Sequence, residues 1–236
     1  MTMSISENIA RVRANIARAA EEAGRSPSEI TLVGASKMND AAACRAAIAA
    51  GIDALGENRV QEMTQKLAEH AYDGAPLHFI GHLQRNKVKL VVGKVDLIES
   101  VGSLELLRLS DAQSEKLGLV QDILLEVNIG GEDAKSGFAP DALFAAAEQT
   151  LLLGHVRLRG LMCIPPVALE EHGSIPYFEK VSALSVDINE KLYHNRLDIL
   201  SMGMSGDYED AVRSGATMVR LGTAIFGARN YPVSTL

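Results

Sequence analysis

Residues 30–50 read ITLVGASKMNDAAACRAAIAA, which is a strand, a turn and a helix in direct succession. Ile30 to Ser36 are apolar and partly β-branched, which is typical of a buried strand. After a polar turn, Ala41 to Ala50 form an alanine-rich segment with high helix propensity. A strand buried on both faces and followed by a helix is the repeating unit of a parallel sheet, so this stretch predicts an α/β fold.

The same succession recurs along the chain. We expect strands at residues 30–36, 53–58, 77–82, 95–101, 122–129, 156–164, 197–204 and 217–227. We expect helices at residues 41–50, 60–70, 87–92, 104–117, 142–152, 177–192 and 208–214. A further amphipathic helix precedes them, because Ser4 and Glu7 have capping-box spacing. Repeated β-α units with no break in composition predict a single domain, residues 1–236, that folds as a closed (β/α)8 TIM-type barrel with an N-terminal lead-in helix.

The composition and charge of the chain argue against several classes of protein. The net charge of −7 argues against nucleic-acid and anionic-membrane partners, and the absence of Trp argues against a base-stacking surface. Cys44 and Cys163 lack metal-type spacing, so we expect two buried apolar residues in a reduced, cytoplasmic protein. The charged residues among 1–22 are unlike a signal peptide, and no apolar run is long enough to span a membrane. A monomer is the default expectation.

Lys37 directly follows the first expected strand, at the end where parallel barrels carry their chemistry. Burying a lysine ammonium is costly and lowers the pKa of the amine, which then attacks aldehydes to form a Schiff base. The alternative is that Lys37 lies just past the strand with its ammonium in water. Lys135 is a competing candidate, but it lies near acidic residues in a loop, where an ordinary ammonium is favoured.

Other polar residues lie at the carboxyl ends of expected strands and should meet Lys37 at one rim. They are Asn58, His82, Ser100 and Asn128, together with the groups Ser201–Ser205 and Arg220–Thr223. Each residue alone could be a helix cap or a turn residue. Their convergence predicts a binding site.

Two loops predict a phosphate site. Ser201 to Asp207, which includes Met204 and Ser205, joins a strand to a helix through small residues whose backbone amides are accessible. Leu221-Gly222-Thr223 does the same after the last strand. In many barrels the loops after strands 7 and 8 bind phosphate, although tight turns with an Asp207 cap would look similar.

Arg220 lies inside the apolar run Met218-Val219-Arg220-Leu221-Gly222. Alternation along the strand sends Val219 and Leu221 to one face and Arg220 to the other, which we expect to be the barrel interior. A buried guanidinium needs an acceptor, supplied either by a ligand ring nitrogen or by an Asp or Glu within the barrel. A lysine, a phosphate site and a donor for a ring nitrogen together describe a site for pyridoxal 5′-phosphate (PLP).

Seven segments, in order, closely resemble the pyridoxal-phosphate homeostasis protein family. They are GASKMND at Lys37, GENRVQE at Gly56–Glu62, HFIGHLQRNK at His78–Lys87, VNIGGEDAKSGF at Val127–Phe138, RGLMCIPP at Arg159–Pro166, SMGMSGDYEDAV at Ser201–Val212 and GATMVRLGTAIFGAR at Gly215–Arg229. The resemblance implies a barrel like the N-terminal half of bacterial alanine racemases. It implies an internal aldimine at Lys37, phosphate contacts from Ser205, Gly222 and Thr223, Arg220 at the pyridine nitrogen and Asn58 beside the ring. Ser201, Met204 and, more weakly, His82 complete the candidate cofactor site.

Arg220 also bears on activity. A guanidinium at the ring nitrogen disfavours protonation of the ring, so carbanions would be poorly stabilised. The resembled racemases add a second domain and a partner's tyrosine, and we expect neither here. The sequence therefore predicts a PLP-binding protein without robust turnover that holds the cofactor and supplies it to apo-enzymes. The alternatives are a PLP-dependent amino-acid racemase of low activity and a Schiff-base aldolase acting on a sugar phosphate.

Overall fold

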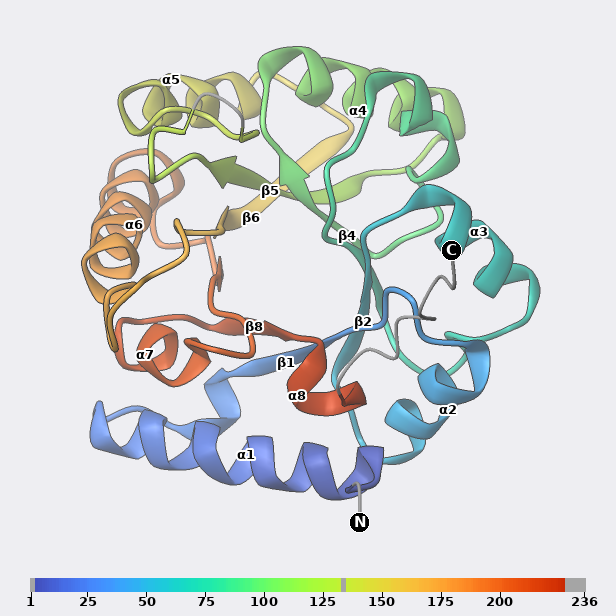
Figure 1. Cartoon of the computed structure of the whole chain (residues 1–236). Coiled ribbons are helices and arrows are strands. Elements are labelled where there is room, and N and C mark those ends of the chain that lie inside the picture. The colour runs from blue at the N-terminus through green and yellow to red at the C-terminus, as the bar shows by residue number, and fades with distance from the viewer. Residues whose placement is uncertain (1–2, 133–134, 228–236) are drawn as a thin grey trace, which may run out of the picture.

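Eight parallel strands pair in sequence order and close into a barrel in the computed structural model, which describes residues 3–132 and 135–227 (Figure 1). The strands are β1 (Thr31–Ala35), β2 (Ala54–Glu57), β3 (Leu77–Phe79), β4 (Leu97–Val101), β5 (Gln121–Val127), β6 (Val156–Cys163), β7 (Ile199–Ser201) and β8 (Met218–Leu221). Closure occurs where β1 pairs with β8, with Thr31 opposite Met218. The predicted (β/α)8 barrel is confirmed. Residues 1–2, 133–134 and 228–236, which the predicted domain also includes, lie outside the described part.

Helices surround the barrel (Figure 1). They are α1 (Ile5–Glu22), α2 (Ala41–Ala49), α3 (Val60–Ala68), α4 (Leu104–Leu117), α5 (Pro140–Thr150), α6 (Ile175–Ile188), α7 (Tyr208–Arg213) and α8 (Thr223–Phe226), with short helical turns η1 (Pro27–Glu29), η2 (Arg85–Leu90) and η3 (Asn189–Tyr193). The lead-in helix α1 begins with the expected capping box between Ser4 and Glu7. It packs against α7 and α8, and the Asn8 side-chain amide donates a hydrogen bond to the Ile225 carbonyl oxygen (2.9 Å).

Two apolar clusters stabilise the barrel. A small cluster lies inside it and consists of Val33, Ala54, Leu97, Leu124, Met162 and Met218. The larger cluster lies between the sheet and the helices and includes Leu32, Leu55, Ile98 and Leu125, the strand neighbours of interior residues. This alternation follows the pleat of each strand. Cys44 and Cys163 are buried as predicted.

Several predicted boundaries are wrong. The last strand was expected over residues 217–227, but β8 ends at Leu221 and the apolar residues after it form α8. Gly222 leaves the extended conformation, with φ −103° and ψ −82°, so the run that resembles a strand turns into a helix. The strands expected at 77–82 and 197–204 shorten to β3 and β7, and the helix expected at 87–92 is the 3-10 turn η2. Single backbone hydrogen bonds continue past the shortened strands, from the Ile80 amide to the Glu57 carbonyl oxygen (2.9 Å) and from the Met202 amide to the Met218 carbonyl oxygen (3.1 Å), but regular strand pairing ends there.

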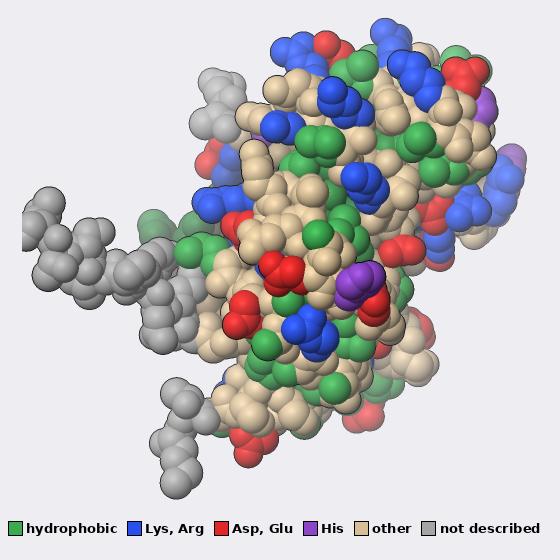
Figure 2. Space-filling model, turned by 90° about the vertical axis from the view of Figure 1, so that its right-hand side faces the viewer, with side chains coloured by type: hydrophobic (Ala, Val, Ile, Leu, Met, Phe, Trp, Pro, Cys, Tyr) green, Lys and Arg blue, Asp and Glu red, His purple; other side chains and the backbone are tan. Residues whose placement is uncertain are grey.

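The surface carries charges of both signs. Figure 2 shows the face that includes α3, where basic and acidic side chains are interspersed with apolar ones. No helix within the described ranges is long and apolar enough to cross a membrane.

Candidate functional site

Lys37 lies in a turn at the carboxyl end of β1, where the rim of the barrel begins. The residue is half-buried, which lies between the two alternatives of a buried lysine and an ammonium in water. Asn39 donates a hydrogen bond to the Lys37 carbonyl oxygen (3.1 Å). Met38 has a positive φ of 62°, and its backbone amide donates to Glu62 Oε2 (2.8 Å). Such left-handed conformations are uncommon for residues other than glycine and are enriched at functional sites.

A buried polar cluster supports this turn from behind. Glu57 Oε1 accepts hydrogen bonds from Ser36 Oγ (2.6 Å), Lys66 Nζ (2.6 Å) and Tyr72 Oη (3.0 Å). Lys66 Nζ also donates to the Ser36 carbonyl oxygen (2.8 Å), one residue before Lys37. Burial and the Glu57 carboxylate raise the pKa of the Tyr72 phenol, which therefore stays a proton donor. The cluster joins β1, β2 and α3 immediately beside Lys37.

A second polar chain crosses the barrel interior. Arg220 lies inside the barrel and donates hydrogen bonds to Ser201 Oγ (2.5 Å) and to the Cys163 carbonyl oxygen (2.9 Å). Ser201 Oγ donates in turn to Glu99 Oε2 (2.6 Å), and His78 Nδ1 lies 2.8 Å from Glu99 Oε1. Four strands, β3, β4, β7 and β8, thus contribute one connected side chain each, and β6 contributes a carbonyl group.

This series of hydrogen-bonded side chains is organised around the Glu99 carboxylate, which is fully buried. Burial alone would raise the pKa of this carboxyl, but the hydrogen bond and charge of His78 and the charge of Arg220 hold it below its usual range. Arg220 Nη1 lies 3.6 Å from Glu99 Oε2. The sequence allowed two kinds of acceptor for Arg220, a ligand ring nitrogen or an acidic residue within the barrel. The structure contains the second, Glu99. Ser201, which belongs to the predicted phosphate loop, bonds to both Arg220 and Glu99.

The loops after β7 and β8 lie against each other. Ser205 Oγ accepts a hydrogen bond from the Ala224 backbone amide (3.2 Å), which links the first loop to α8. The Met204 amide is not available to a ligand, because it donates to Asp207 Oδ1 (2.7 Å). Thr223 is exposed at the start of α8, directly after Gly222. The two predicted loops therefore meet, with the Asp207 carboxylate shaping the first.

Three further predicted residues lie in the loops after β2, β3 and β5. Asn58 follows β2 at the rim, and its Oδ1 atom is buried with no hydrogen-bond donor among the described residues. A side chain on Gly81 would collide with the Asn58 backbone, since its Cβ would lie 2.3 Å from that carbonyl oxygen. His82 is exposed and lies in the loop after β3. Asn128 closes its own loop by donating to the Glu132 carbonyl oxygen (2.9 Å).

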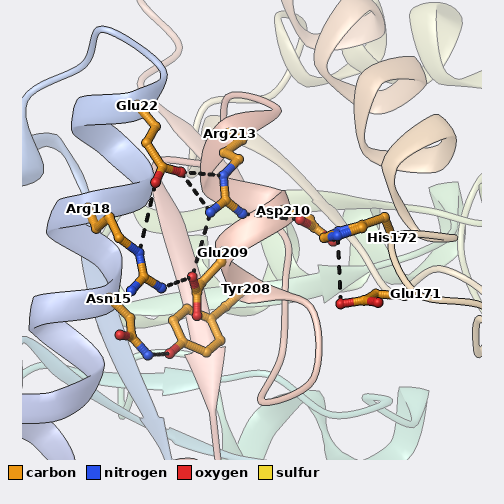
Figure 3. A network of polar contacts seen from close by, with 9 residues as sticks. All are labelled: Asn15, Arg18, Glu22, Glu171, His172, Tyr208, Glu209, Asp210 and Arg213. Carbon is orange, nitrogen blue, oxygen red and sulfur yellow. Dashed lines mark hydrogen bonds and ion pairs between the residues drawn. The ribbon is translucent and has the colours of Figure 1, made fainter.

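A network on the outer surface holds α7, which follows the Ser205 loop, against α1 (Figure 3). Arg18 pairs with Glu209 (2.6 Å), and Arg213 pairs with both Glu22 (2.8 Å) and Asp210 (3.2 Å). His172, before α6, lies 2.8 Å from the same Asp210. The hydrogen bond and the charge of Asp210 raise the pKa of the His172 imidazole. These exposed pairs orient α7 and contribute little individually.

Comparison with known proteins assigns the chain to a family. The sequence model of the alanine racemase N-terminal domain matches residues 8–230. A pyridoxal phosphate homeostasis protein of Pseudomonas aeruginosa is 44% identical, covering 97% of either chain. This chain belongs to the pyridoxal phosphate homeostasis protein family. Another family member, from Aquifex aeolicus, is 42% identical over 97% of this chain and 100% of its own.

Solved structures agree with this family. The structure of PipY from Synechococcus elongatus with PLP bound superposes with a TM-score of 0.82 at 34% identity, covering 95% of this chain and all of that chain. PipY without PLP gives a TM-score of 0.85 at 35% identity, with the same coverage.

Sequence reasoning missed the residues that hold the site from within. Glu57 and Lys66 were not recognised, because a charged residue in a short strand and another in a helix give no sign of pairing. His78 and Glu99 do have a signal. His78 lies between Leu77 and Phe79, and Glu99 follows Ile98; these apolar neighbours face the helices, which is the pattern that identified Arg220.

Proposed function

We propose that this chain binds PLP covalently through Lys37 at the carboxyl rim of the barrel. The observation that carries the proposal is that Lys37 follows β1, which pairs with the strand that carries Arg220, in a barrel that superposes on PipY with PLP bound. When bound, the cofactor would supply an aldehyde, a phosphate and a pyridine nitrogen. The chain has a matching residue type for each of these three groups.

The unpaired atoms of the rim fit such a ligand. The buried Asn58 Oδ1 has bonding capacity left, because none of the described residues donates to it. A Cβ on Gly222 would make only ordinary contacts with Ala35, at 3.6 Å from its carbonyl oxygen and 3.8 Å from its Cβ, so the backbone there is open to close approach. Ser205, Gly222 and Thr223 are the residues we assign to the phosphate, with Ser201 and Met204 supporting that loop.

Arg220 would orient the ring. A guanidinium has donors and no acceptor, so it can only donate to the pyridine nitrogen. The ion pair with Glu99 and the hydrogen bond to Ser201 fix its position. A donor held in this way disfavours a protonated ring, which argues against strong carbanion chemistry. His82, exposed on the opposite side of the rim, is the weakest member of the assigned set.

In the cell we propose a role in PLP homeostasis, in which the chain holds the cofactor and supplies it to apo-enzymes. Two curated relatives above 40% identity carry this name. We further propose that the chain is a cytoplasmic monomer without robust turnover. The monomer is checked by sedimentation. The supply role is checked by timed transfer of PLP to an apo-enzyme in the presence of a trap for free cofactor, and transfer no faster than trapping would contradict direct supply.

The assignment of Lys37 is tested by visible absorbance of the purified chain with added PLP. We expect a band of bound cofactor that Lys37→Ala abolishes and Lys135→Ala retains. Lys135 is the matched control, because it is also a half-buried lysine and its ammonium lies 2.6 Å from Glu132 Oε1. Borohydride reduction and peptide mapping should find the pyridoxyl group on Lys37. A modified Lys135 would refute the assignment, and a chain that reacts only with sugar phosphates would favour an aldolase.

A weak amino-acid racemase is the second candidate, favoured by the match to the alanine racemase N-terminal domain. Its test is stereoinversion of a panel of L-amino acids, with Lys37→Ala as the control. Sustained inversion that depends on Lys37 would replace the non-catalytic role with a catalytic one.

A further inference from the structure

A cavity opens on the rim of the barrel, on the side away from the β7 and β8 loops. This cavity, of about 740 Å³, lies among the loops that follow β3, β4 and β5. The lining residues that matter here are His82, Arg85, Ser100, Ser103, Glu105 and Ser136. The proposed PLP contacts do not include this cavity, apart from the exposed His82.

Ser100 is the unusual residue in its wall. The register of β4 against β5 shifts between Ile98 and Val101, and both of those residues face the helices. The two residues between them therefore point away from that core, which is the effect of a β-bulge. Glu99 joins the interior chain, whereas Ser100 lines the cavity. Ser100 is 2% exposed, and its hydroxyl has no hydrogen-bond partner within the described residues.

The start of α4 forms the adjoining wall. Ser103 caps this helix by accepting a hydrogen bond from the Leu106 amide (3.2 Å). The amides of the first helical turn have no acceptor within a helix, and the helix dipole favours negative charge there. The unpartnered Ser100 hydroxyl lies in the same cavity. Together they provide donors for a carboxylate.

The remaining wall carries charges of both signs. Arg85 pairs with Glu105 (2.6 Å) at the outer edge, and His82 lies on the β3 side. Beneath the cavity, the buried Glu126 carboxyl accepts a hydrogen bond from Ser136 Oγ (2.9 Å). A purely anionic ligand would meet these two carboxyl groups, and a purely cationic ligand would meet Arg85 and the helix start. A small zwitterion satisfies both.

We propose that this cavity is a subsite for a free α-amino acid, whose carboxylate binds Ser100 and the start of α4 and whose ammonium lies toward the acidic groups. The subsite goes beyond the proposed function, because it assigns a ligand other than the cofactor to the rim. Its formation depends only on the described residues of the chain and not on bound PLP.

The test is calorimetric titration of the full chain with L-alanine, with propionate and with L-alanine methyl ester. We expect saturable binding of L-alanine and weaker binding of the other two, which lack the ammonium and the carboxylate respectively. Ser100→Ala should weaken L-alanine binding by about ten-fold, because a hydrogen bond to a charged group is lost. Ser110→Ala is the matched control, since Ser110 is also a buried serine with an unpartnered hydroxyl, but it lies outside this cavity.

Folding is monitored separately by thermal unfolding. Because the Ser100 hydroxyl has no partner within the described residues, Ser100→Ala should leave the melting temperature unchanged or raise it. The inference is overturned if L-alanine does not saturate at millimolar concentrations, if the methyl ester binds equally well, or if both serine variants act alike. PLP binding, measured by absorbance on the same preparation, distinguishes failure of this subsite from failure of the proposed function.

Discussion

The buried pair of Lys66 and Glu57 supports the turn that presents Lys37, and its removal should be costly. Lys66→Met keeps a long apolar side chain but removes the ammonium that bonds Glu57 Oε1 at 2.6 Å and the Ser36 carbonyl oxygen at 2.8 Å. The Glu57 side chain is fully buried, so its charge would remain without a cation. Breaking one half of a buried pair costs about 3–5 kcal/mol.

The assays are urea unfolding, which gives the free energy of unfolding, and thermal unfolding, both followed by circular dichroism at neutral pH. For a chain of this size, about 3–5 kcal/mol corresponds to a fall in melting temperature of roughly 6–20 °C. Lys191→Met is the matched control, because Lys191 pairs with Asp187 at 2.5 Å on the exposed surface. That change should cost less than about 1 kcal/mol.

The double variant Glu57→Gln/Lys66→Met tests the physical cause. With no buried charge left, it should recover most of the lost stability, since replacing a buried pair by neutral groups is often nearly neutral. Equal losses for Lys66→Met and Lys191→Met, or no recovery in the double variant, would refute the reasoning.

Two further predictions follow from close contacts. A Cβ on Gly160 would lie 1.7 Å from the Ile199 carbonyl oxygen, so Gly160→Ala should abolish the β6–β7 pairing and sharply lower the melting temperature. Gly154→Ala, whose Cβ would meet nothing within 4 Å, should be tolerated, and equal behaviour of the two variants would contradict this account. His172 should titrate above its ordinary pKa of 6.5 by NMR, and Asp210→Asn should lower that pKa. The stabilisation from this pair should be complete below the ordinary pKa and should be lost as the pH rises through the raised one. An unchanged titration in Asp210→Asn would rule the contact out.

Much of the fold could be predicted because the strands are short, buried and separated by alanine- or leucine-rich helices. The errors lie in segments where local pattern and tertiary packing disagree. Residues 222–226 are apolar enough to continue β8, yet packing against α1 makes them helical. Propensity is a weak prior that such contacts override.

Parts of the candidate site could be predicted for the same reason. Arg220 interrupts an apolar alternation, so its inward direction follows from the pleat alone. Its partner does not, because Glu99 belongs to a strand more than a hundred residues earlier. The orphaned hydroxyl of Ser100 was equally hidden, since it depends on a register shift against β5.

The sequence by itself determined the order of strands and helices, the barrel that this order forms, and the rim on which Lys37 lies. These follow from periodicity and from the rule that the carboxyl ends of parallel strands share one face. Only the tertiary structure decided which buried charges meet, as in the Glu57–Lys66 and Glu99–Arg220 pairs. The physical reason is that burial makes partners obligatory, while the identity of each partner depends on register and helix placement across the closed barrel.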